Sequence, residues 1–475
     1  MWPYWFYVVA LVVVGITHWV YRWKNPKCNG KLPPGSMGFP LIGETIEFLR
    51  TSKSLDVSPF MKKRMKKYGS LFKTNLAGRP VVVSSNPDFS YFLLQQEGKL
   101  VERWYLDSFA KLLRQDVTSI ISVHYIHKYL RNLILSHFGS ERLKADLLPG
   151  LENAISGSLQ DWSELPRVEV KSVISNMIFD FTARRLFGYE VAKSSEKDLA
   201  QSFTNFLEGL MKFPLNVPGT SFYKCKKNQK RILKLIADEL GKRRESPKKQ
   251  KEDMLDQIVE DMKKETFWTD DFAIYVMFGI LLASFETISS TLAVCINFLT
   301  DNPSMVQKLT EEHEELVKNR ENKNSGLSWE EYKSMTYTHH VVKESLRLAS
   351  VAPGILRRAL KDIEVDGYTI PKGWAILVVP AAVQLNPNTY EDPLAFNPSR
   401  WENMGEVATA KNFIAFGGGS RSCTGAEFSK VLMAVFLHVF VTKYRLTKIK
   451  GGEMIRCPVL AFGDGLHVQV TAKLE

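Results

Sequence analysis

The sequence predicts a mostly α-helical protein with small β-sheets, built as one large domain that follows a single N-terminal transmembrane helix. Three observations support this fold class. An uncharged apolar run opens the chain from Met1 to Tyr21. Long segments with the helical spacing of apolar residues dominate the rest, namely Phe272–Thr300, Ser304–Asn319, Trp329–Leu348 and Ala426–Tyr444. Short strand-like segments lie between Gly and Pro residues, at Arg79–Ser84, Thr369–Ile370, Ala375–Val379 and His467–Val470.

The composition excludes several classes of protein. Of the 475 residues, 45% are hydrophobic and 24% are charged, so the chain can bury a core and is not disordered. The 29 Gly and 21 Pro residues follow no repeating period, which excludes collagen-like and solenoid architectures. The five cysteines are too scattered for a disulfide framework or a Cys-rich metal cluster. The bulk of the chain is therefore expected to face the reducing cytosol.

The net charge of +12 favours an anionic partner, which could be nucleic acid, an anionic membrane surface or an acidic protein. The positive charge is not gathered in a recognisable nucleic-acid module, so we expect no nucleic-acid partner. The one strong charge run, RRESPKKQK at Arg243–Lys251, is interpreted as a solvated loop between helices, with partner docking as the alternative.

The apolar run Met1–Tyr21 is long enough to cross a bilayer as a helix. Tryptophans lie near both ends of the run, as in an interfacial aromatic belt, at Trp2, Trp5, Trp19 and Trp23. The basic residues that follow the run indicate that its C-terminal side is in the cytosol, namely Arg22, Lys24, Lys27 and Lys31. A cleaved signal peptide is the main alternative. It is disfavoured because no positive charge precedes the run and no small-residue cleavage site follows it.

A proline-rich segment, LPPGSMGFPLIG at Leu32–Gly43, follows the anchor. Because proline cannot continue a helix and Pro-Pro is stiff and extended, we interpret this segment as a semi-rigid strut, with a plain surface loop as the alternative. The expected organisation is an anchor at residues 1–21, a hinge at residues 22–45 and one large domain at residues 46–475.

The most informative segment is Phe416–Gly425, with the sequence FGGGSRSCTG. Three consecutive glycines let a backbone approach a bulky flat ligand. Cys423 precedes a helix expected to start near Ala426, and both the helix N-terminus and Arg421 favour the thiolate. A single thiolate cannot form a zinc or iron–sulfur site, but it can be the sole protein ligand of a haem iron. The alternative is a Gly-rich loop with an incidental cysteine.

The spacing F-x-x-G-x-R-x-C-x-G resembles the haem-binding motif of the cytochrome P-450 superfamily, with matches at Phe416, Gly419, Arg421, Cys423 and Gly425. The resemblance implies haem b, with Cys423 as the axial iron ligand and Arg421 at a haem propionate. Thr424 departs from the family, which usually has an apolar residue there, and its hydroxyl is expected to alter hydrogen bonding at the sulfur without removing the ligand.

The second motif is E-x-x-R, at Glu344 and Arg347, which share one face of a helix. Alone it predicts no more than a surface ion pair. It resembles the invariant pair of the same superfamily, and FNPSRW at Phe396–Trp401 resembles the segment that completes it. The resemblance implies a buried structural triad of Glu344, Arg347 and Arg400.

The third motif is ASFETI at Ala283–Ile288, where an acid and an alcohol interrupt a long apolar helix. Oxygen activation needs protons, and a carboxylate and a hydroxyl can relay them. The motif resembles the acid–alcohol pair of the superfamily's distal helix, which implies a proton relay of Glu286 and Thr287. Ser284 stands where the family usually has glycine, and its side chain would narrow the oxygen groove or add a hydrogen-bond donor. The alternative is a Thr bonded back to its own helix beside a Glu at a groove edge.

The fourth motif, HKYLR, puts His127 and Arg131 on one helix face. The family commonly has W-x-x-x-R here, whose ends reach a propionate, and His127 replaces the Trp. By the same resemblance, Arg357 is a further propionate candidate. An exposed basic helix face is the alternative for this segment.

Three phrases resemble the plant clan of brassinosteroid and triterpenoid oxidases, and within it the triterpene and sterol hydroxylases that include the β-amyrin and cucurbitadienol oxidases: FPLNVPGT at Phe213–Thr220, WEEYKSM at Trp329–Met335 and RALKDIEVDGYTIPKGW at Arg358–Trp374. By this resemblance the apolar substrate wall is Trp104, Tyr105, Leu210, Phe213, Phe278, Leu282, Ala352, Ile355, Leu460 and Phe462. Taken singly, each of these residues could be ordinary core packing.

The resemblance implies a monooxygenase anchored in the endoplasmic reticulum, with its catalytic domain in the cytosol. Two electrons come from NADPH through a separate NADPH–cytochrome P-450 reductase, and one atom of O2 enters a triterpenoid skeleton. The alternatives are a sterol oxidase, including repeated oxidation with side-chain cleavage, an oxygen-independent isomerase or lyase, and a membrane-anchored scaffold with an inert haem.

Overall fold

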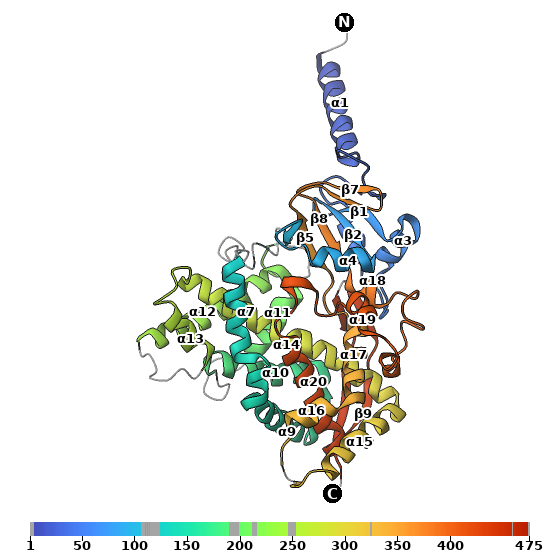
Figure 1. The fold of residues 1–475 in the computed structure, drawn as a ribbon. Helices are drawn as coiled ribbons and strands as arrows, with labels where there is room; N and C mark the ends of the chain where they lie inside the picture. Colours follow the sequence, from blue (N-terminus) through green and yellow to red (C-terminus); the bar gives the residue numbers. More distant parts are fainter. Residues whose placement is uncertain are drawn as a thin grey trace.

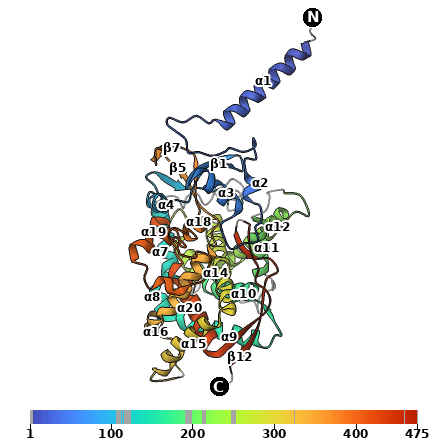
Figure 2. The same cartoon turned by 90° about the vertical axis from the view of Figure 1, so that its right-hand side faces the viewer.

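The computed structural model describes residues 4–105, 110, 112, 114, 124–189, 199–210, 216–245, 253–323, 325–457 and 459–473. Most of the molecule is a body of packed helices, and a sheet-rich region lies at one end of it (Figure 1). Helix α1 (Tyr4–Lys24) leaves the molecule beyond that sheet-rich region, and the C-terminus lies at the opposite end (Figures 1 and 2). The mostly helical fold with small sheets is as predicted.

Helix α1 has no buried residue. It is one of two described helices that are long and apolar enough to cross a membrane; the other, α14 (Asp270–Asp301), is 50% buried inside the body. A helix with no buried residue and with most of its apolar side chains exposed is suited to bilayer hydrocarbon, so α1 is the candidate anchor. It extends past the apolar run, so Arg22 and Lys24 lie in its last turn.

The proline-rich segment is tied to the body. Trp23 Nε1 donates to the Met37 carbonyl at 3.2 Å, and the Lys73 backbone and ammonium donate to the carbonyls of Pro34 and Pro33 at 2.8 and 3.0 Å. Gly35 has φ +146°, and a Cβ there would lie 2.0 Å from the Lys73 carbonyl oxygen, so only glycine allows this contact. The segment is therefore attached to strand β1.

The main sheet has five strands in the order β1-β2-β8-β5-β3. Their bounds are β1 Leu71–Leu76, β2 Arg79–Ser84, β8 Ala375–Val378, β5 Ile355–Ala359 and β3 Val101–Arg103. Strands β2 and β8 pair in parallel, and the other pairs are antiparallel. Val81, Val82 and Val83 are all fully buried, so β2 is covered on both faces, as a central strand requires. The predicted strand Arg79–Ser84 is confirmed.

Three smaller sheets complete the β structure. They pair β6 (Ile363–Val365) with β7 (Tyr368–Ile370), β10 (Met454–Cys457) with β11 (Val459–Phe462), and β12 (Leu466–Ala472) with both β4 (Val168–Glu169) and β9 (Tyr444–Gly451). The remaining predicted strands, Thr369–Ile370, Ala375–Val379 and His467–Val470, fall within β7, β8 and β12, although β8 ends at Val378.

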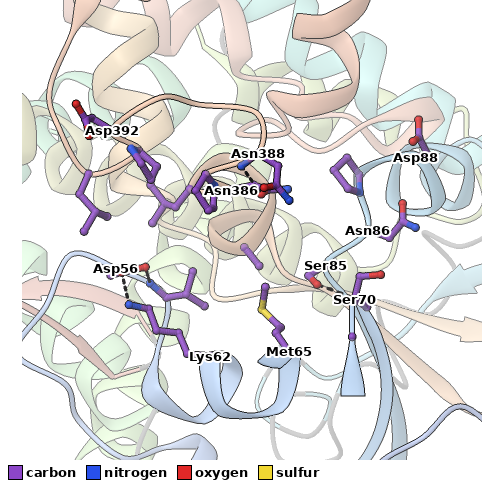
Figure 3. A pocket seen from close by; sticks show the side chains of 18 of the residues that line it. Asp56, Lys62, Met65, Ser70, Ser85, Asn86, Asp88, Asn386, Asn388 and Asp392 are labelled. Atoms are coloured by element: carbon purple, nitrogen blue, oxygen red, sulfur yellow. Dashed lines mark hydrogen bonds and ion pairs between the residues drawn. The ribbon is translucent and has the colours of Figure 1, made fainter. Parts of the chain in front are cut away.

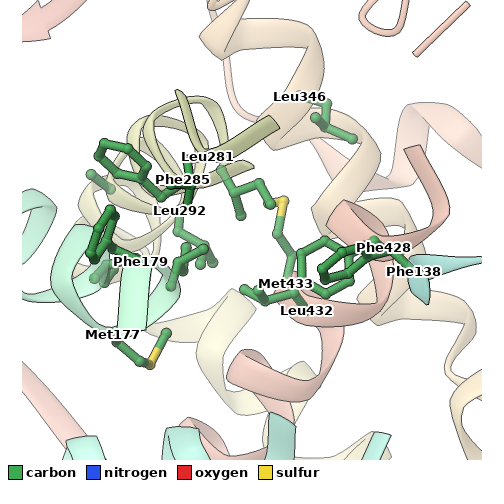
Figure 4. Packing of buried hydrophobic residues seen from close by; sticks show 14 of the residues in the cluster. Phe138, Met177, Phe179, Leu281, Phe285, Leu292, Leu346, Phe428, Leu432 and Met433 are labelled. Carbon is green, nitrogen blue, oxygen red and sulfur yellow. The ribbon is translucent and has the colours of Figure 1, made fainter. Parts of the chain in front are cut away.

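Helix α14 lies at the centre of the helical body (Figure 1). It packs against α10 (Val170–Phe187), where the Phe179 and Phe285 rings meet edge to face at 5.5 Å. Figure 4 shows this contact, with Phe428, Leu432 and Met433 of α20 (Ala426–Lys443) in the same cluster. These apolar contacts hold α10, α14 and α20 as one unit.

The other helices surround this centre. Their bounds are α2 Thr45–Phe48, α3 Pro59–Tyr68, α4 Pro87–Leu94, α7 His124–Phe138, α8 Ser140–Arg142, the π-helix η2 Leu143–Leu147, α9 Leu148–Ser163, α11 Leu199–Leu210, α12 Ser221–Glu245, α13 Met254–Asp261, α15 Pro303–Lys318, α16 Trp329–Ser334, α17 Thr336–Ala349, α18 Pro380–Gln384, the 3₁₀ turns η4 Pro398–Trp401 and η5 Gly419–Arg421, and α19 Glu406–Asn412.

One predicted helix is wrong in its continuity. Trp329–Leu348 is two helices, α16 and α17, separated at Met335, whose ψ of 69° is not helical. The Glu312 carboxylate of α15 accepts the backbone N–H groups of Tyr337 and Thr338 at 2.7 and 2.9 Å. A side chain from another helix thus caps α17, and the helical spacing of apolar residues carries no sign of that contact.

Candidate active site

A cavity of about 1100 Å³ lies between α14, the loop before α20, and strands β5 and β11. A second hollow of about 400 Å³ shares several of its lining residues, among them His127, Thr287 and Cys423. Cys423 and Thr287 thus border both spaces. The thiol comes from the segment before α20, and the hydroxyl comes from α14.

The loop that carries Cys423 is closed by a hydrogen bond from the Cys423 backbone N–H to the Phe416 carbonyl at 2.9 Å. The expectation that all three glycines serve a ligand needs correction. Gly417 lines the large cavity and has φ +69°. Gly419 instead packs on α4, because a Cβ there would lie 2.1 Å from the Leu94 carbonyl oxygen. The third glycine therefore fits the loop to the body.

The Cys423 side chain is open to the two internal spaces, which it lines. The surrounding protein separates the thiol from bulk water, and this burial raises its pKa. The Gly425 backbone N–H and the charge of Arg131 lower the pKa, but their effect is smaller. Arg421, which we expected to favour the thiolate, pairs with a carboxylate, and Arg131 is the cation that lowers the pKa of the thiol. A bound metal cation would supply the missing charge, since coordination deprotonates a thiol.

The carboxylate that pairs with Arg421 is Glu97, which belongs to none of the predicted motifs. Its Oε1 accepts from Arg421 Nε at 3.0 Å, and its Oε2 lies 3.1 Å from Arg357 Nε. All three side chains are largely buried. Burial lowers the pKa of both arginines, and Glu97 opposes that effect. No local motif marks Glu97, because the two arginine side chains that it pairs with lie hundreds of residues further along the chain.

Further basic groups face the same region. Arg131 Nη1 donates to the Ser422 carbonyl at 2.8 Å and to Thr424 Oγ1 at 3.3 Å, so the unusual Thr424 ties α7 to the cysteine loop. His127 lines both spaces. Burial, followed by the charges of Arg421, Arg131 and Arg103, lowers the pKa of His127 to about 4. The described residues here therefore hold more positive than negative charge.

These residues fit a haem. The large cavity is bordered by an available cysteine sulfur, by apolar side chains, and by arginines in excess over Glu97. A flat apolar ring with one metal and two carboxylates matches this set of groups. Cys423 would hold the iron, and Arg131, Arg357, Arg421 and His127 would face the carboxylates.

The acid–alcohol pair comes from α14. Thr287 lines both spaces, and its Oγ1 donates to the Ala283 carbonyl at 3.0 Å, so the back-bonded geometry considered as the alternative is present. Ser284 Oγ donates to the Leu281 carbonyl at 2.8 Å and leaves the helix unbroken. Glu286 lines the larger cavity, and its Oε1 pairs with Lys171 Nζ at 2.5 Å. Lys171 belongs to none of the predicted motifs.

The structure brings Glu344, Arg347 and Arg400 together. Arg347 donates to both carboxylate oxygens of Glu344, at 2.8 and 2.7 Å, and Arg400 Nε donates at 3.0 Å. Glu344 and Arg347 are fully buried. Trp401 Nε1 adds a fourth side-chain donor at 3.1 Å, which the sequence analysis did not name. This cluster joins α17 to η4.

The predicted substrate wall is brought together only in part. Tyr105, Ala352, Ile355 and Leu460 line the larger space, and Phe278 lines the smaller one with Tyr105. Phe462 lines a separate small cavity of about 10 Å³. Trp104 and Leu282 pack against the core and are not among the residues that border the described cavities. Phe213 and the Leu210 side chain lie outside the described residues.

Another hollow, of about 870 Å³, lies between α3, α4 and the segment after α18. Figure 3 shows that acids and amides border it, and that Asp56 pairs with Lys62 there. None of the predicted site residues lines it. The chemistry that the motifs predict therefore belongs to the cavities beside Cys423.

The comparisons with known proteins agree with this geometry. A family model described as Cytochrome P450 matches residues 33–462. A beta-amyrin 16-alpha-hydroxylase of Maesa lanceolata is 45% identical over 474 residues, and a cucurbitadienol 11-hydroxylase of Siraitia grosvenorii is 44% identical over 473 residues; each match covers 100% of both chains. The solved structure of retinoic acid-bound cyanobacterial CYP120A1 matches with a TM-score of 0.82 at 25% identity, over 94% of this chain and 100% of that one.

Proposed function

The chain belongs to the cytochrome P450 family, and on that premise we propose that it hydroxylates a triterpenoid skeleton such as β-amyrin. As a member of the family it is a monooxygenase that uses a haem with a cysteine thiolate ligand and electrons from NADPH delivered by a reductase. The observation that carries the substrate class is the identity of 45% and 44%, over the full length, to a beta-amyrin and a cucurbitadienol hydroxylase.

The assignment of individual residues follows from their chemistry. Cys423 holds the iron, and Arg421, Arg357, Arg131 and His127 bind the two propionates of the haem, with Phe416, Gly419 and Gly425 shaping the loop. When bound, the haem activates dioxygen so that one oxygen atom enters an unactivated C–H bond. Glu286 and Thr287 pass protons into the cavity from α14. Glu344, Arg347 and Arg400 brace the fold around the site.

The cavity supports a rigid apolar substrate. Ala352, Ile355, Leu460 and Phe278 contribute apolar surface, and the charged groups that line these spaces include Arg357, Arg421 and Glu286. A fused-ring skeleton loses little conformational entropy on binding such a wall, which favours triterpenoids over flexible chains. The apolar wall holds the skeleton, and contact with it excludes water from the reacting carbon.

The apolar α1 anchors the protein in a membrane, which we assign to the endoplasmic reticulum, with residues 46–475 in the cytosol. The uncharged run followed directly by Arg22, Lys24, Lys27 and Lys31 supports this orientation. The excess of positive charge supports docking of an acidic reductase domain on the cytosolic side.

The test begins with the carbon-monoxide difference spectrum of the reduced full-length protein in membranes, beside Cys423→Ala. A strongly red-shifted Soret band that the substitution abolishes is expected. The same membranes, with reductase and NADPH, are then given β-amyrin, cucurbitadienol and a panel of sterols. A hydroxylated triterpene is expected. Oxidation of sterols alone would replace the proposed substrate class by the sterol alternative, and turnover without NADPH or oxygen would indicate an isomerase or lyase.

A further inference from the structure

Helices α10 and α14 carry a row of polar contacts across an otherwise apolar interface. On α10, Lys171, Ser175 and Thr182 share one face. Each meets a polar side chain of α14: Lys171 Nζ lies 2.5 Å from Glu286 Oε1, Ser175 Oγ lies 2.9 Å from Ser289 Oγ, and Ser284 Oγ lies 3.4 Å from Thr182 Oγ1. Polar groups between packed helices are costly unless they are matched, so these matched pairs set how α10 faces α14.

The pair of Lys171 and Glu286 differs from the rest of the row because it borders the large cavity. Both residues line that cavity, and their side chains are 26% and 20% exposed. Glu286 Oε2 is buried and has no hydrogen-bond partner among the described residues. One carboxylate oxygen is therefore held from α10, while the other remains available for a further bond.

The backbone of Lys171 is fixed. The N-cap residue of α10, Glu169, accepts from the backbone N–H groups of Lys171 and Ser172 at 3.4 and 2.7 Å, and it also accepts from Leu466 N in β12 at 3.2 Å. The Lys171 side chain borders the small cavity next to Leu460 and Phe462 of β11. The ammonium thus reaches Glu286 from a rigid junction between a helix start and two sheets.

This ion pair is one-fifth to one-quarter exposed, and its position beside the cavity is more informative than its contribution to stability. Glu286 stands between Lys171 on one side and the cavity-facing Thr287, its neighbour in α14, on the other. The Glu286 backbone is held as well, because Ser289 Oγ donates to its carbonyl at 3.1 Å. A carboxylate fixed at this place can take a proton from water on the Lys171 side and release it toward Thr287.

We propose that Lys171 is a positioning residue for proton delivery, which holds the Glu286 carboxylate across the interface of α10 and α14 in the orientation that hands protons to the cavity. This inference rests on the proposed monooxygenase function. Lys171 is not consumed: each proton enters from water, passes through the Glu286 carboxyl group and leaves on the cavity side. Glu286 without Lys171 would adopt other rotamers, and reduced oxygen would escape as hydrogen peroxide.

The experiment compares Lys171→Met, Lys171→Arg, Glu286→Gln and the double variant Lys171→Met/Glu286→Gln, in the full chain with reductase and NADPH. The matched control is Lys448→Met, because Lys448 pairs with Asp301 of the same helix at 2.9 Å with a similar exposure of 25%, but away from the cavity. The readouts are the fraction of NADPH recovered as hydroxylated product, the hydrogen peroxide released, the solvent deuterium isotope effect, and the melting temperature without substrate.

Lys171→Met is expected to lower the coupled fraction on the order of tenfold, because positioned proton donors contribute at least that much. The isotope effect should rise, the double variant should resemble Glu286→Gln alone, and Lys171→Arg should restore most of the coupling. Lys448→Met should match the parent. Haem content and the carbon-monoxide band should stay unchanged in all of them.

Two results would overturn the proposal: coupling in Lys171→Met equal to the parent, or losses from Lys171→Met and Glu286→Gln that multiply in the double variant.

The melting temperatures separate this outcome from a failure of the proposed function, because they need no substrate. If the two single shifts add in the double variant, the ion pair does not operate, whatever the substrate proves to be. If the shifts are coupled and no triterpenoid is oxidised, the substrate class fails, and peroxide release during NADPH oxidation still tests Lys171.

Discussion

Glu344 has no exposed surface, yet three side chains and one backbone N–H donate to its carboxylate. A buried ion pair with this many donors contributes to a single well-defined arrangement more than to net stability. Removing one partner is a different matter, because the remaining charge stays buried without compensation. This asymmetry makes the loss of Glu344 costly for the fold.

We therefore expect Glu344→Ala to lower the free energy of unfolding by about 3–5 kcal/mol, because Arg347 would remain buried and unpaired. Denaturant unfolding of the full chain in detergent measures this loss, and the haem content should fall with it. Lys411→Ala serves as the control, because the ion pair of Lys411 with Asp88 is on the surface. This variant should keep the denaturant midpoint of the parent. Equal midpoints for both variants would contradict the prediction.

Glu97 leads to a second prediction for a single residue. It shares Arg357 and Arg421 with the propionates that we expect the haem to bring. In Glu97→Gln the haem-free protein loses the only carboxylate that faces both arginines among the described residues, whereas the haem-loaded protein keeps the propionates. The melting temperatures of the two forms should therefore move further apart than in the parent, as a thermal-shift measurement can show. A loss of the same size in both forms would contradict this.

The sequence predicts the site residues that belong to local motifs and misses those that do not. Cys423, Thr287 and Arg131 follow from spacing within a single segment, and all three lie at the cavity. Glu97 and Lys171 belong to no such spacing; Lys171 meets Glu286 115 positions further along the chain. Only packing creates these pairs, so single-sequence patterns carry no sign of them.

At the scale of elements, α15 and α20 meet through two buried histidines. His438 Nδ1 and His313 Nδ1 lie 3.0 Å apart, and Thr338 Oγ1 of α17 lies 2.9 Å from His313 Nε2. Burial, with smaller effects from His438 and Arg320, lowers the pKa of His313 to about 3. Burial, then Arg320 and Lys443, lowers the pKa of His438 to about 4. Both rings are therefore neutral in the folded protein at neutral pH.

Stability should consequently fall in mild acid. Free histidine has a pKa near 6.5, so the unfolded chain takes up protons below that pH while the folded chain takes them up only near pH 4 and 3. The contribution is complete above about pH 6.5 and is lost progressively as the pH falls toward 4. Unfolding free energies measured from pH 7.5 to 5 should show this slope, and His438→Phe should flatten it. An unchanged slope in that variant would assign the acid sensitivity to other groups.

The hairpin of β10 and β11 allows a test of the substrate wall. Leu460 borders both the large and the small cavity, whereas Phe462 borders the small one and is not among the described residues that line the large one. Leu460→Ala should therefore change the ratio of hydroxylated products, measured by mass spectrometry, while Phe462→Ala should have the smaller effect. Both should keep the carbon-monoxide band. The reverse order of effects would move Phe462 into the wall and Leu460 out of it.

The sequence predicts the limits of some helices but not the interruption of others. The long helices Asp270–Asp301 and Pro303–Lys318 begin and end within a few residues of their predicted limits, because each has an apolar face with helical spacing and a clear start. The interruption at Met335 was not predictable, since the capping carboxylate of Glu312 belongs to another helix. Periodicity thus identifies elements, and contacts between elements decide where they break.

At the scale of the whole molecule, the charge of +12 leads to an expectation about electron supply. If an acidic reductase docks by electrostatic attraction, salt should weaken the encounter, because the Debye length falls from about 10 Å at 0.1 M to about 3 Å at 1 M. Turnover with reductase should therefore slow between low and high salt, while turnover supported by an added peroxide should not. Equal rates with reductase at both salt concentrations would argue against docking by charge.

The attachment of the proline-rich segment to β1 has a consequence for how the enzyme meets its substrate. Strand β1 belongs to the same sheet as β5 and β8, and Ile355 of β5 borders the cavity. A transmembrane helix joined rigidly to that sheet would fix the orientation of the cavity relative to the bilayer, as well as the distance between the cavity and the bilayer. An apolar molecule dissolved in the bilayer would then always meet the same side of the protein, and its delivery would depend on a few proline and glycine contacts far from any reacting atom.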